Sequence, residues 1–319
     1  MSRYYAFNGD ADGLCALHQL RLVESEPAIL ATGVKRDINL LRHVPSGAGD
    51  VVTALDISLE QNRNDLLRLL DAGVPVRYFD HHRSGELPES PLLEAHIDES
   101  ADVCTSVLVD HYIGGRHRLW AIVAAFGDNL PQTALTMVIQ AGLDPKATVA
   151  LEKLGTCLNY NAYGESIEDL HYPPAELAEL MRPFADPAAF IGQTEVLARL
   201  QAGYEDDMAK ARLAAAFQGA APVVVVLPNQ PWARRAVGVL TNELARSRPD
   251  TPHAILSPKA SGGFTVSIRV PACSPISAAE FCGKFETGGG RKLAGGINFL
   301  AESELDHFVA RFQAHFTAL

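Results

Sequence analysis

Three side chains that can bind a metal ion, those of Asp80, His81 and His82, stand next to one another in the sequence. They follow residues 74–79, a short β-branched and aromatic run that is typical of a buried strand. Carboxylate and imidazole together suit manganese, magnesium, iron or zinc. Because ligands of open α/β sheets bind beyond the carboxyl ends of the strands, this stretch predicts part of a metal site. Taken alone, it would instead indicate a polar turn with two surface histidines.

Two other apolar runs end in acids in the same way. Residues 4–7 lead into a glycine-flanked turn with Asp10 and Asp12, whose carboxylates can face one point because they lie two residues apart. Residues 50–58 form a further strand, which carries Asp56 near its end. Helix capping is the ordinary role of an Asp before a helix. Capping explains one acid of the pair, but it does not explain the repetition along the chain.

Asp128 is a further acid behind an apolar segment, residues 119–126, which the sequence leaves as a helix or a strand. Without the other acids it would indicate a turn before Pro131. Acids gathered at one sheet edge repel one another, and the repulsion raises their pKa values unless cations lie among them. Two divalent ions roughly 3.5–4 Å apart would remove the repulsion, lower the pKa of bound water and clamp a phosphoryl group. The acids therefore predict hydrolysis of a phosphoester or phosphoanhydride.

Strands and helices alternate in the first half of the chain, which is the pattern of a mostly parallel sheet. Helical spacing follows at residues 14–22 and 59–72, residues 29–32 form another strand, and residues 132–182 are helical. The sequence therefore predicts an α/β fold in which the acids meet at the carboxyl ends of the strands.

The second half predicts a smaller α/β domain. Residues 193–217 read as one long helix, and strands restart at residue 223. We expect a catalytic domain at residues 1–185, a helical connector at residues 186–218 and a C-terminal domain at residues 219–319, which is an ordinary size for a domain.

A glycine run followed by two cations lies in this second half, formed by Gly288, Gly289, Gly290, Arg291 and Lys292. Glycines let backbone N–H groups approach an anion, and arginine can hold a phosphate in a fork. The run therefore predicts a phosphate cradle in preference to a tight turn with surface charge. Arg269, at the end of an alternating strand, is a further candidate for the same role.

Candidates for substrate contacts also lie in the first half. Lys35 and Arg36 follow the strand at residues 29–32, and both are first read as solvated surface charges, although Arg36 could meet a phosphate oxygen. Tyrosines and amides at residues 159–164 could stack on a nucleobase or form an ordinary loop. The sequence does not decide between these two roles.

The composition is that of a globular protein, with 47% hydrophobic residues, 20% charged residues and a formal net charge of -11. This balance argues against long duplex nucleic acid as a partner, because phosphate neutralisation needs Lys and Arg, but it permits a short nucleotide held by metals and a few arginines. Five scattered cysteines, no signal-like N-terminus and no apolar run of about 20 residues predict a cytoplasmic protein without a membrane span.

The motifs at residues 8–13, Asp56, residues 80–82 and residues 127–128 come in the order and rough spacing of the DHH phosphoesterase superfamily, and the chain resembles that superfamily. Its members include RecJ-type exonucleases, oligoribonuclease/pAp-phosphatases, cyclic-dinucleotide phosphodiesterases and family II pyrophosphatases. The second half is similar to the DHH-associated C-terminal domain, which in the superfamily closes over the metal site and holds the other end of the substrate.

The resemblance implies two divalent metal ions, with manganese as the expected metal, and it implies a set of ligands: Asp10, Asp12, Asp56, His81 and Asp128. Asp56 would lie between the two ions. Asp80 is implied either as a weak ligand or as the partner that orients a ligand. His82 is implied as the group that contacts the scissile phosphate or protonates the leaving oxygen.

Two positions depart from the superfamily pattern. Asn8 stands where many relatives carry a histidine ligand and RecJ-like members an aspartate, so one metal site would be weaker or more hydrated. Arg291 stands where the glycine run of the family usually ends in histidine. An anion contact by Arg291 remains plausible, but a role that needs imidazole does not.

The leading expectation is a manganese-dependent phosphodiesterase that cleaves a linear dinucleotide, such as pGpG, or a very short oligonucleotide into mononucleotides. Arg269, Arg291 and Lys292 would hold the terminal phosphate of the substrate. The expected partners are short nucleic acids, with neither long duplex DNA nor a membrane among them, and a homodimer is one option for the oligomeric state.

Three alternatives stay open. The first is a RecJ-like exonuclease on single-stranded DNA, which would require a basic, aromatic groove and a longer chain. The second is a 3'-phosphatase acting on pAp, or a pyrophosphatase. The third is a nucleotide-binding sensor with a degenerate metal site, which only the departure at Asn8 supports.

Overall fold

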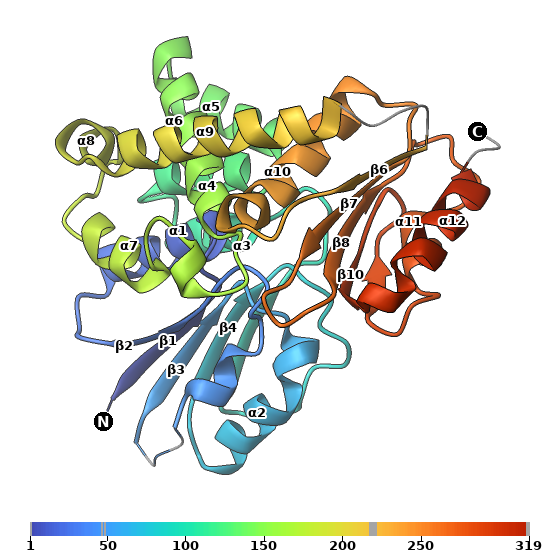
Figure 1. The fold of residues 1–319 in the computed structure, drawn as a ribbon. Helices are drawn as coiled ribbons and strands as arrows, with labels where there is room; N and C mark the ends of the chain where they lie inside the picture. Colours follow the sequence, from blue (N-terminus) through green and yellow to red (C-terminus); the bar gives the residue numbers. More distant parts are fainter. Residues whose placement is uncertain (1, 46, 48, 217–221, 317–319) are drawn as a thin grey trace. The chain divides into compact units, whose positions relative to one another are not determined.

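The fold is given by a computed structural model, which describes residues 2–45, 47, 49–216 and 222–316 (Figure 1). The chain divides into two compact units, Met1–Gln201 and Ala202–Leu319. The division falls within the long helix α9 (Val196–Ala216). Among the described residues, no helix is both long enough and apolar enough to cross a membrane.

The first unit is built on a five-stranded sheet with the order β2-β1-β3-β4-β5, in which all neighbouring strands run parallel. In register, Phe7 pairs with Leu55, and Leu55 pairs with Phe79. The carboxyl ends of the three central strands therefore lie side by side, which confirms the predicted α/β fold. The strands are β1 (Arg3–Phe7), β2 (Ile29–Thr32), β3 (Val51–Leu55), β4 (Val76–Asp80) and β5 (Leu93–Ile97).

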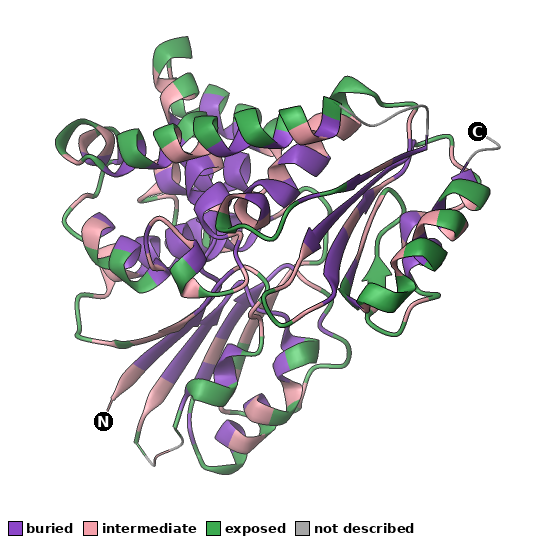
Figure 2. Cartoon of the chain, viewed as in Figure 1, coloured by how far each residue is buried: buried purple, intermediate pink, exposed green. Residues whose placement is uncertain are grey.

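Helices cover both faces of this sheet, as expected when parallel strands are joined by crossover helices. Tyr5 and Phe7 of β1 pack into one core with α1, α3, α4 and α6, whereas Tyr4 and Ala6 pack into the other with α2 and η1. Figure 2 shows the central strands buried between these layers. The helices of the unit are α1 (Ala11–Val23), η1 (Leu40–His43), α2 (Leu59–Asp71), α3 (Thr105–Tyr112), α4 (Arg118–Gly127), α5 (Pro131–Ala141), α6 (Pro145–Asn161), η2 (Ile167–Asp169), α7 (Pro174–Met181) and α8 (Pro187–Gln193).

Three local predictions need comment. The segment that could be a helix or a strand is α4, which is apolar all round because it is buried on every side. The edge strand β5 was not predicted, since its half-exposed residues form no apolar run. The single helix predicted at residues 193–217 begins later, because Thr194 is extended and separates α8 from α9; Phe217 lies outside the described residues.

The second unit contains a five-stranded sheet with the order β6-β7-β8-β10-β9. Only β6 and β7 pair in parallel, and the other neighbours are antiparallel. Phe281, Phe308 and Phe312 fill one core of the unit, and Met208 of α9 packs into its other core. The elements are β6 (Val223–Val226), α10 (Pro231–Ser247), β7 (His253–Pro258), β8 (Phe264–Arg269), α11 (Ala278–Cys282), β9 (Gly288–Gly290), β10 (Ala294–Leu300), η3 (Glu302–Glu304) and α12 (Leu305–Phe316).

Two glycines set the position of the end of α4. A Cβ atom added at Gly155 of α6 would lie 2.1 Å from the carbonyl oxygen of Val123, and one added at Gly127 would lie 2.4 Å from Cβ of Ala11. Helices α4, α6 and α1 can therefore approach this closely only because both positions lack a side chain. The close approach brings Asp128, which ends α4, next to the start of α1.

We expect Gly155→Ala to lower the free energy of unfolding by about 1–3 kcal/mol, because the added methyl group overpacks the contact between α4 and α6. Urea unfolding followed by circular dichroism measures the change. The matched control is Gly192→Ala in α8, where an added Cβ meets nothing within 4 Å and should leave stability unchanged or slightly higher. Equal stabilities for the two variants would contradict the packing argument.

Candidate metal centre

The acids at the carboxyl edge of the parallel sheet come together in the structure. Asp10 caps the N-terminus of α1, Asp12 lies in the first turn of that helix, and Asp56 follows β3 directly. All three are buried. Asp128, whose side chain is 20% exposed, reaches the same place from the end of α4. Four carboxylates from three separate stretches of sequence thus share one site.

His81 presents one ring nitrogen to these acids. Its Nδ1 lies 2.8 Å from the carbonyl oxygen of Val103 and donates to it, so Nε2 is the ring nitrogen that can bind a metal once it has lost its proton. The Nε2 atom lies 3.5 Å from an oxygen of Asp56 and 3.7 Å from an oxygen of Asp128. A histidine that binds a metal commonly donates its other N–H to a carbonyl in this way, so the ring is oriented for ligation.

Asp12 is held by the first turn of α3. Its two carboxylate oxygens accept hydrogen bonds from the backbone N–H groups of Thr105 and Ser106, each at 2.7 Å. The positive end of the helix dipole stabilises the anion there. A carboxylate accepts several bonds at each oxygen, so Asp12 keeps lone pairs for a cation. These contacts fix the side chain without using up its capacity to bind a metal.

Asp56 adopts a backbone conformation that is uncommon for a residue with a side chain. Its φ angle is 58°, in the left-handed region. The backbone N–H donates to the carbonyl oxygen of Phe79 at 3.0 Å, and one carboxylate oxygen accepts from Thr105 Oγ1 at 3.3 Å. Conformations of this kind cluster at functional sites, where the surrounding structure holds them. The result is a carboxylate that lies beside Thr105 and faces Nε2 of His81.

The donor set fits a divalent cation. Among the described residues, two groups offer ligand atoms that all lie within 4.8 Å of one another, and His81 belongs to both. Asp12 and Asp128 complete one group, and Asp56 and His82 complete the other. Carboxylate oxygens with an imidazole nitrogen are the ligands of manganese, magnesium, iron or zinc.

Asp80 and His82 form a pair beside this cluster. Asp80 is fully buried, and its Oδ1 accepts a hydrogen bond from His82 Nδ1 at 2.7 Å. Its other oxygen has no hydrogen-bond partner among the described residues. The His82 side chain is 37% exposed, so its Nε2 can meet a bound molecule. Of the two roles left open for Asp80, this geometry favours the orienting partner, since Asp80 lies in neither group of candidate ligands.

Lys35 is a residue of the site that was not predicted from the sequence. It was read as a solvated surface charge, but its ammonium group forms ion pairs with Asp10 and, at 3.6 Å, with Asp128. It also donates to the side-chain oxygen of Asn159 at 3.0 Å. A signal was available, because Lys35 follows the carboxyl end of a strand, as the acids do.

Other predicted residues of the first unit have different surroundings. Asn8 is buried. Its side-chain amide donates to the carbonyl oxygen of Lys35 at 3.3 Å and accepts from the N–H of Asp10, so both ends of the amide are hydrogen-bonded to backbone groups. Arg36 is exposed. Tyr160 and Asn161, which could have stacked on a base, are fully buried, and Asn161 bonds to the backbone of Tyr172. Stacking by Tyr160 is therefore ruled out.

The glycine run of the second unit is not the open loop that a phosphate cradle requires. Gly288–Gly290 form the edge strand β9, which pairs with β10, and Arg291 closes a tight turn by donating to the carbonyl oxygen of Ala294 at 2.7 Å. The alternative, a tight turn with surface charge, describes the local structure. Arg291 and Lys292 are exposed in that turn, whereas Arg269 donates to Asn242 of α10 at 2.8 Å.

The charges in the centre shift one another's pKa values. Burial, together with repulsion from Asp10 and Asp12, raises the pKa of Asp56 well above its ordinary value. Burial also raises the pKa of Asp10, but the Lys35 ammonium outweighs it and holds that pKa below the usual range. Burial by itself lowers the pKa of His81. The neighbouring carboxylates, with Asp56 first among them, outweigh burial, and the pKa is raised to about 10. The surrounding acids therefore favour positive charge at His81. Without a metal ion, this charge comes from protonation of the ring.

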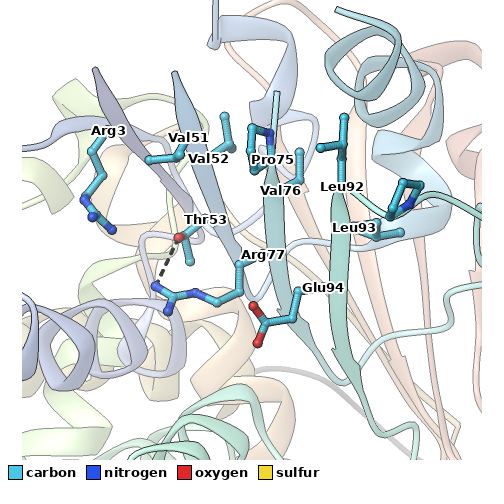
Figure 3. Close-up of a pocket in the computed structure, with 11 residues that line it drawn as sticks. Arg3, Val51, Val52, Thr53, Pro75, Val76, Arg77, Leu92, Leu93 and Glu94 are labelled. Atoms are coloured by element: carbon cyan, nitrogen blue, oxygen red, sulfur yellow. Dashed lines mark hydrogen bonds between the residues drawn. The ribbon is translucent and has the colours of Figure 1, made fainter. Parts of the chain in front are cut away.

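A separate hollow lies at the opposite, N-terminal end of the same strands (Figure 3). Arg3, Arg77 and Glu94 line it, and Figure 3 shows Arg77 bonded to Thr53, at 3.3 Å. Arg77 also forms a two-armed ion pair with Glu24, at 2.7 and 2.9 Å. None of the predicted site residues is among the residues that line this hollow, and both of its arginines are paired, since Arg3 lies 3.2 Å from Glu24 as well.

Several solved structures share the fold. An exonuclease RecJ bound to manganese is 19% identical, with a TM-score of 0.63 and coverage of 98% of this chain and 89% of that chain. RecJ from Thermus thermophilus in complex with Mn2+ is 19% identical with a TM-score of 0.66; this chain spans 52% of its length, with 100% of this chain covered. The pGpG-specific phosphodiesterase PggH from Vibrio cholerae is 13% identical with a TM-score of 0.53, and the match covers 99% of this chain and 100% of that chain.

No protein-family model and no curated protein matches the chain. The likeness to RecJ and PggH therefore concerns the fold alone.

Binding of a divalent cation should release a proton. His81 carries a proton below pH about 10 in the metal-free protein, and a metal must displace it to bind Nε2. The apparent affinity for Mn2+ should therefore rise with pH, by up to about tenfold per unit between pH 6 and 8. Calorimetric titrations in two buffers of different ionisation enthalpy count the protons released. A heat that is independent of the buffer would contradict the displacement of a proton from His81.

Proposed function

We propose that this chain, which has the fold of RecJ and PggH, is a metal-dependent phosphodiesterase that cleaves linear dinucleotides such as pGpG, or very short oligonucleotides, into mononucleotides. The observation that carries the proposal is the position of His81 Nε2, which faces oxygens of Asp56 and Asp128 at the carboxyl edge of the parallel sheet. Ligands of open α/β sheets bind at that edge.

At least one divalent cation would be held by His81 with Asp12, Asp56 and Asp128. Manganese is the first ion to test, since two of the RecJ structures with this fold contain it, and magnesium, found in a third, is the second. When bound, such an ion polarises a phosphoryl oxygen and lowers the pKa of a coordinated water.

His82 would act on the leaving oxygen. Asp80 accepts the hydrogen bond from Nδ1 and so fixes the ring, which leaves the partly exposed Nε2 edge to carry a proton toward the substrate. A buried carboxylate behind a histidine also stabilises the protonated ring. The 2.7 Å hydrogen bond between the two side chains thus gives each a separate role: Asp80 orients the ring of His82, and His82 delivers the proton.

The terminal phosphate of the substrate would be bound by cations outside the metal centre. Arg291 and Lys292 are the best candidates, because the β9–β10 turn exposes both side chains and its two carbonyl oxygens accept backbone bonds from Ala278 and Ala279 of α11. Arg36 is an exposed candidate in the first unit. Arg269 and the glycines Gly288, Gly289 and Gly290 would support this turn and the neighbouring strands.

A preference for short substrates is part of the proposal. The net charge of -11 disfavours a long polyanion. The single-strand exonuclease remains the second candidate, because RecJ structures give TM-scores of 0.63 and 0.66, against 0.53 for PggH.

The five cysteines are free thiols, which suits a reducing compartment such as the cytoplasm.

His82→Ala should lower kcat for pGpG by about 10²- to 10⁴-fold, the usual contribution of a general acid. Turnover is measured with Mn2+ by the mass of the products. The control is His111→Ala, an exposed histidine of α3, which should keep full activity. Unchanged turnover in His82→Ala would remove His82 from the chemistry.

A series of single-stranded oligonucleotides of increasing length separates the two candidate functions. The wild-type protein should act fastest on the dinucleotide, and its rate should fall steeply as the strand lengthens. Sustained degradation of long strands would favour the exonuclease.

Arg291→Ala with Lys292→Ala should raise KM for pGpG by about 10- to 100-fold at unchanged kcat, since charge-assisted bonds to a phosphate contribute about 1.5–3 kcal/mol. GpG, which lacks the terminal phosphate, should be cleaved with the same KM by both proteins. Arg246→Ala, an exposed arginine of α10, is the control. An equal loss on GpG would place the two cations elsewhere than on the terminal phosphate.

A further inference from the structure

The Lys35 side chain occupies a position among the acids that a metal ion could otherwise take. Its Nζ atom contacts an oxygen of Asp10 and lies 3.6 Å from an oxygen of Asp128. It also donates to Asn159 at 3.0 Å. The side chain is only 24% exposed, so the charge is largely withdrawn from solvent. An ammonium group thus lies between two of the carboxylates that the sequence assigned to metal ions.

Several contacts hold Lys35 in this position. Its backbone N–H donates to the carbonyl oxygen of Ala162 at 2.9 Å, and its own carbonyl oxygen accepts from the Asn8 amide at 3.3 Å. The ring of Tyr163 lies 5.8 Å from Nζ, within the range of a cation–π contact. The turn after β2 is therefore fastened to the end of α6 and to the turn after β1, and the side chain has little freedom to leave.

Asp10 has both oxygens engaged. One accepts hydrogen bonds from the backbone N–H groups of Asp12 and Gly13, at 3.0 and 3.1 Å, and the other accepts from Lys35. Asn8, which would be the neighbouring ligand, accepts from the N–H of Asp10 with its amide oxygen. Neither group of candidate ligands among the described residues contains Asp10. Unlike Asp12, whose partners are neutral N–H groups, Asp10 thus already has a full positive charge at one oxygen, and the amide oxygen of Asn8 is taken up by a backbone N–H.

The ligands of the other ion remain available. His81 Nε2 faces Asp56 and Asp128, and Asp12 belongs to the same group as His81 and Asp128. A divalent ion there and the ammonium of Lys35 would together set three positive charges against the four carboxylates. That balance relieves most of the repulsion that two divalent ions would relieve.

We infer that Lys35 replaces one of the two metal ions, so that the centre holds a single divalent cation, bound by His81 with Asp12, Asp56 and Asp128. This inference rests on the proposed metal-dependent function and changes how it is carried out. Lys35 supplies a fixed hydrogen-bond donor and a single charge where a second ion would supply Lewis acidity. Asp128 has one oxygen 3.6 Å from the ammonium and the other 3.7 Å from His81 Nε2, so it would be shared by Lys35 and the ion.

The number of bound Mn2+ ions tests the inference directly. Native mass spectrometry and calorimetry of the full chain should give one ion per chain, and electron paramagnetic resonance should show an isolated ion without the magnetic coupling of a close pair. Lys35→Met removes the charge and frees Asp10, so a second, weaker ion and a coupled spectrum should appear. Lys35→Arg keeps a cation and should still bind one ion.

The control is Lys146→Met, an exposed lysine of α6 whose loss should leave the count at one. If Lys35→Met does not fold, Lys35→Gln, which retains a hydrogen-bond donor, gives the same readout. Two ions in the wild-type protein, or a single ion in both neutral variants, would overturn the inference and leave the proposed phosphodiesterase standing. Failure of the wild-type protein to bind either Mn2+ or Mg2+ would overturn the proposed function itself.

Discussion

Repulsion among four neighbouring carboxylates is the constraint on which the rest of this structure depends. Asp10, Asp12, Asp56 and Asp128 lie in one small, mostly buried space, where the low dielectric strengthens every charge interaction. Such a cluster is stable only if positive charge lies within it. The chain supplies part of that positive charge itself, and a divalent cation would supply the remainder.

Each source of positive charge comes from a different structural element. The first turn of α1 donates backbone N–H groups to Asp10, and the first turn of α3 donates two to Asp12. Lys35 adds a full charge from the turn after β2. Because the parallel strands end at one edge, these helix starts and the turn all reach the same place. His81, with Asp12, Asp56 and Asp128, remains to bind a divalent cation in the proposed centre.

The fold and the chemistry are separate conclusions. RecJ and PggH share the fold at 19% and 13% identity, and a common fold can carry different reactions. What supports the proposed phosphoryl chemistry is this chain's own set of side chains, above all the orientation of His81 by Val103 and of His82 by Asp80. The position of Lys35 distinguishes it from a symmetrical two-ion arrangement.

The sequence by itself determined the alternation of strands and helices and the acids that end the strands, because both are written in local patterns of apolar and charged residues. The edge strand β5 and the pairing of β9 with β10 carry no such pattern, since half-exposed and glycine-rich strands are specified by their neighbours. Only the tertiary structure decided that Lys35 turns inward. The place of Lys35 after a strand end was a signal, but a solvated surface charge can stand there equally well. The difference is made by Asp128 and Asn159, which lie far away in the sequence and contact Lys35 only in the folded chain.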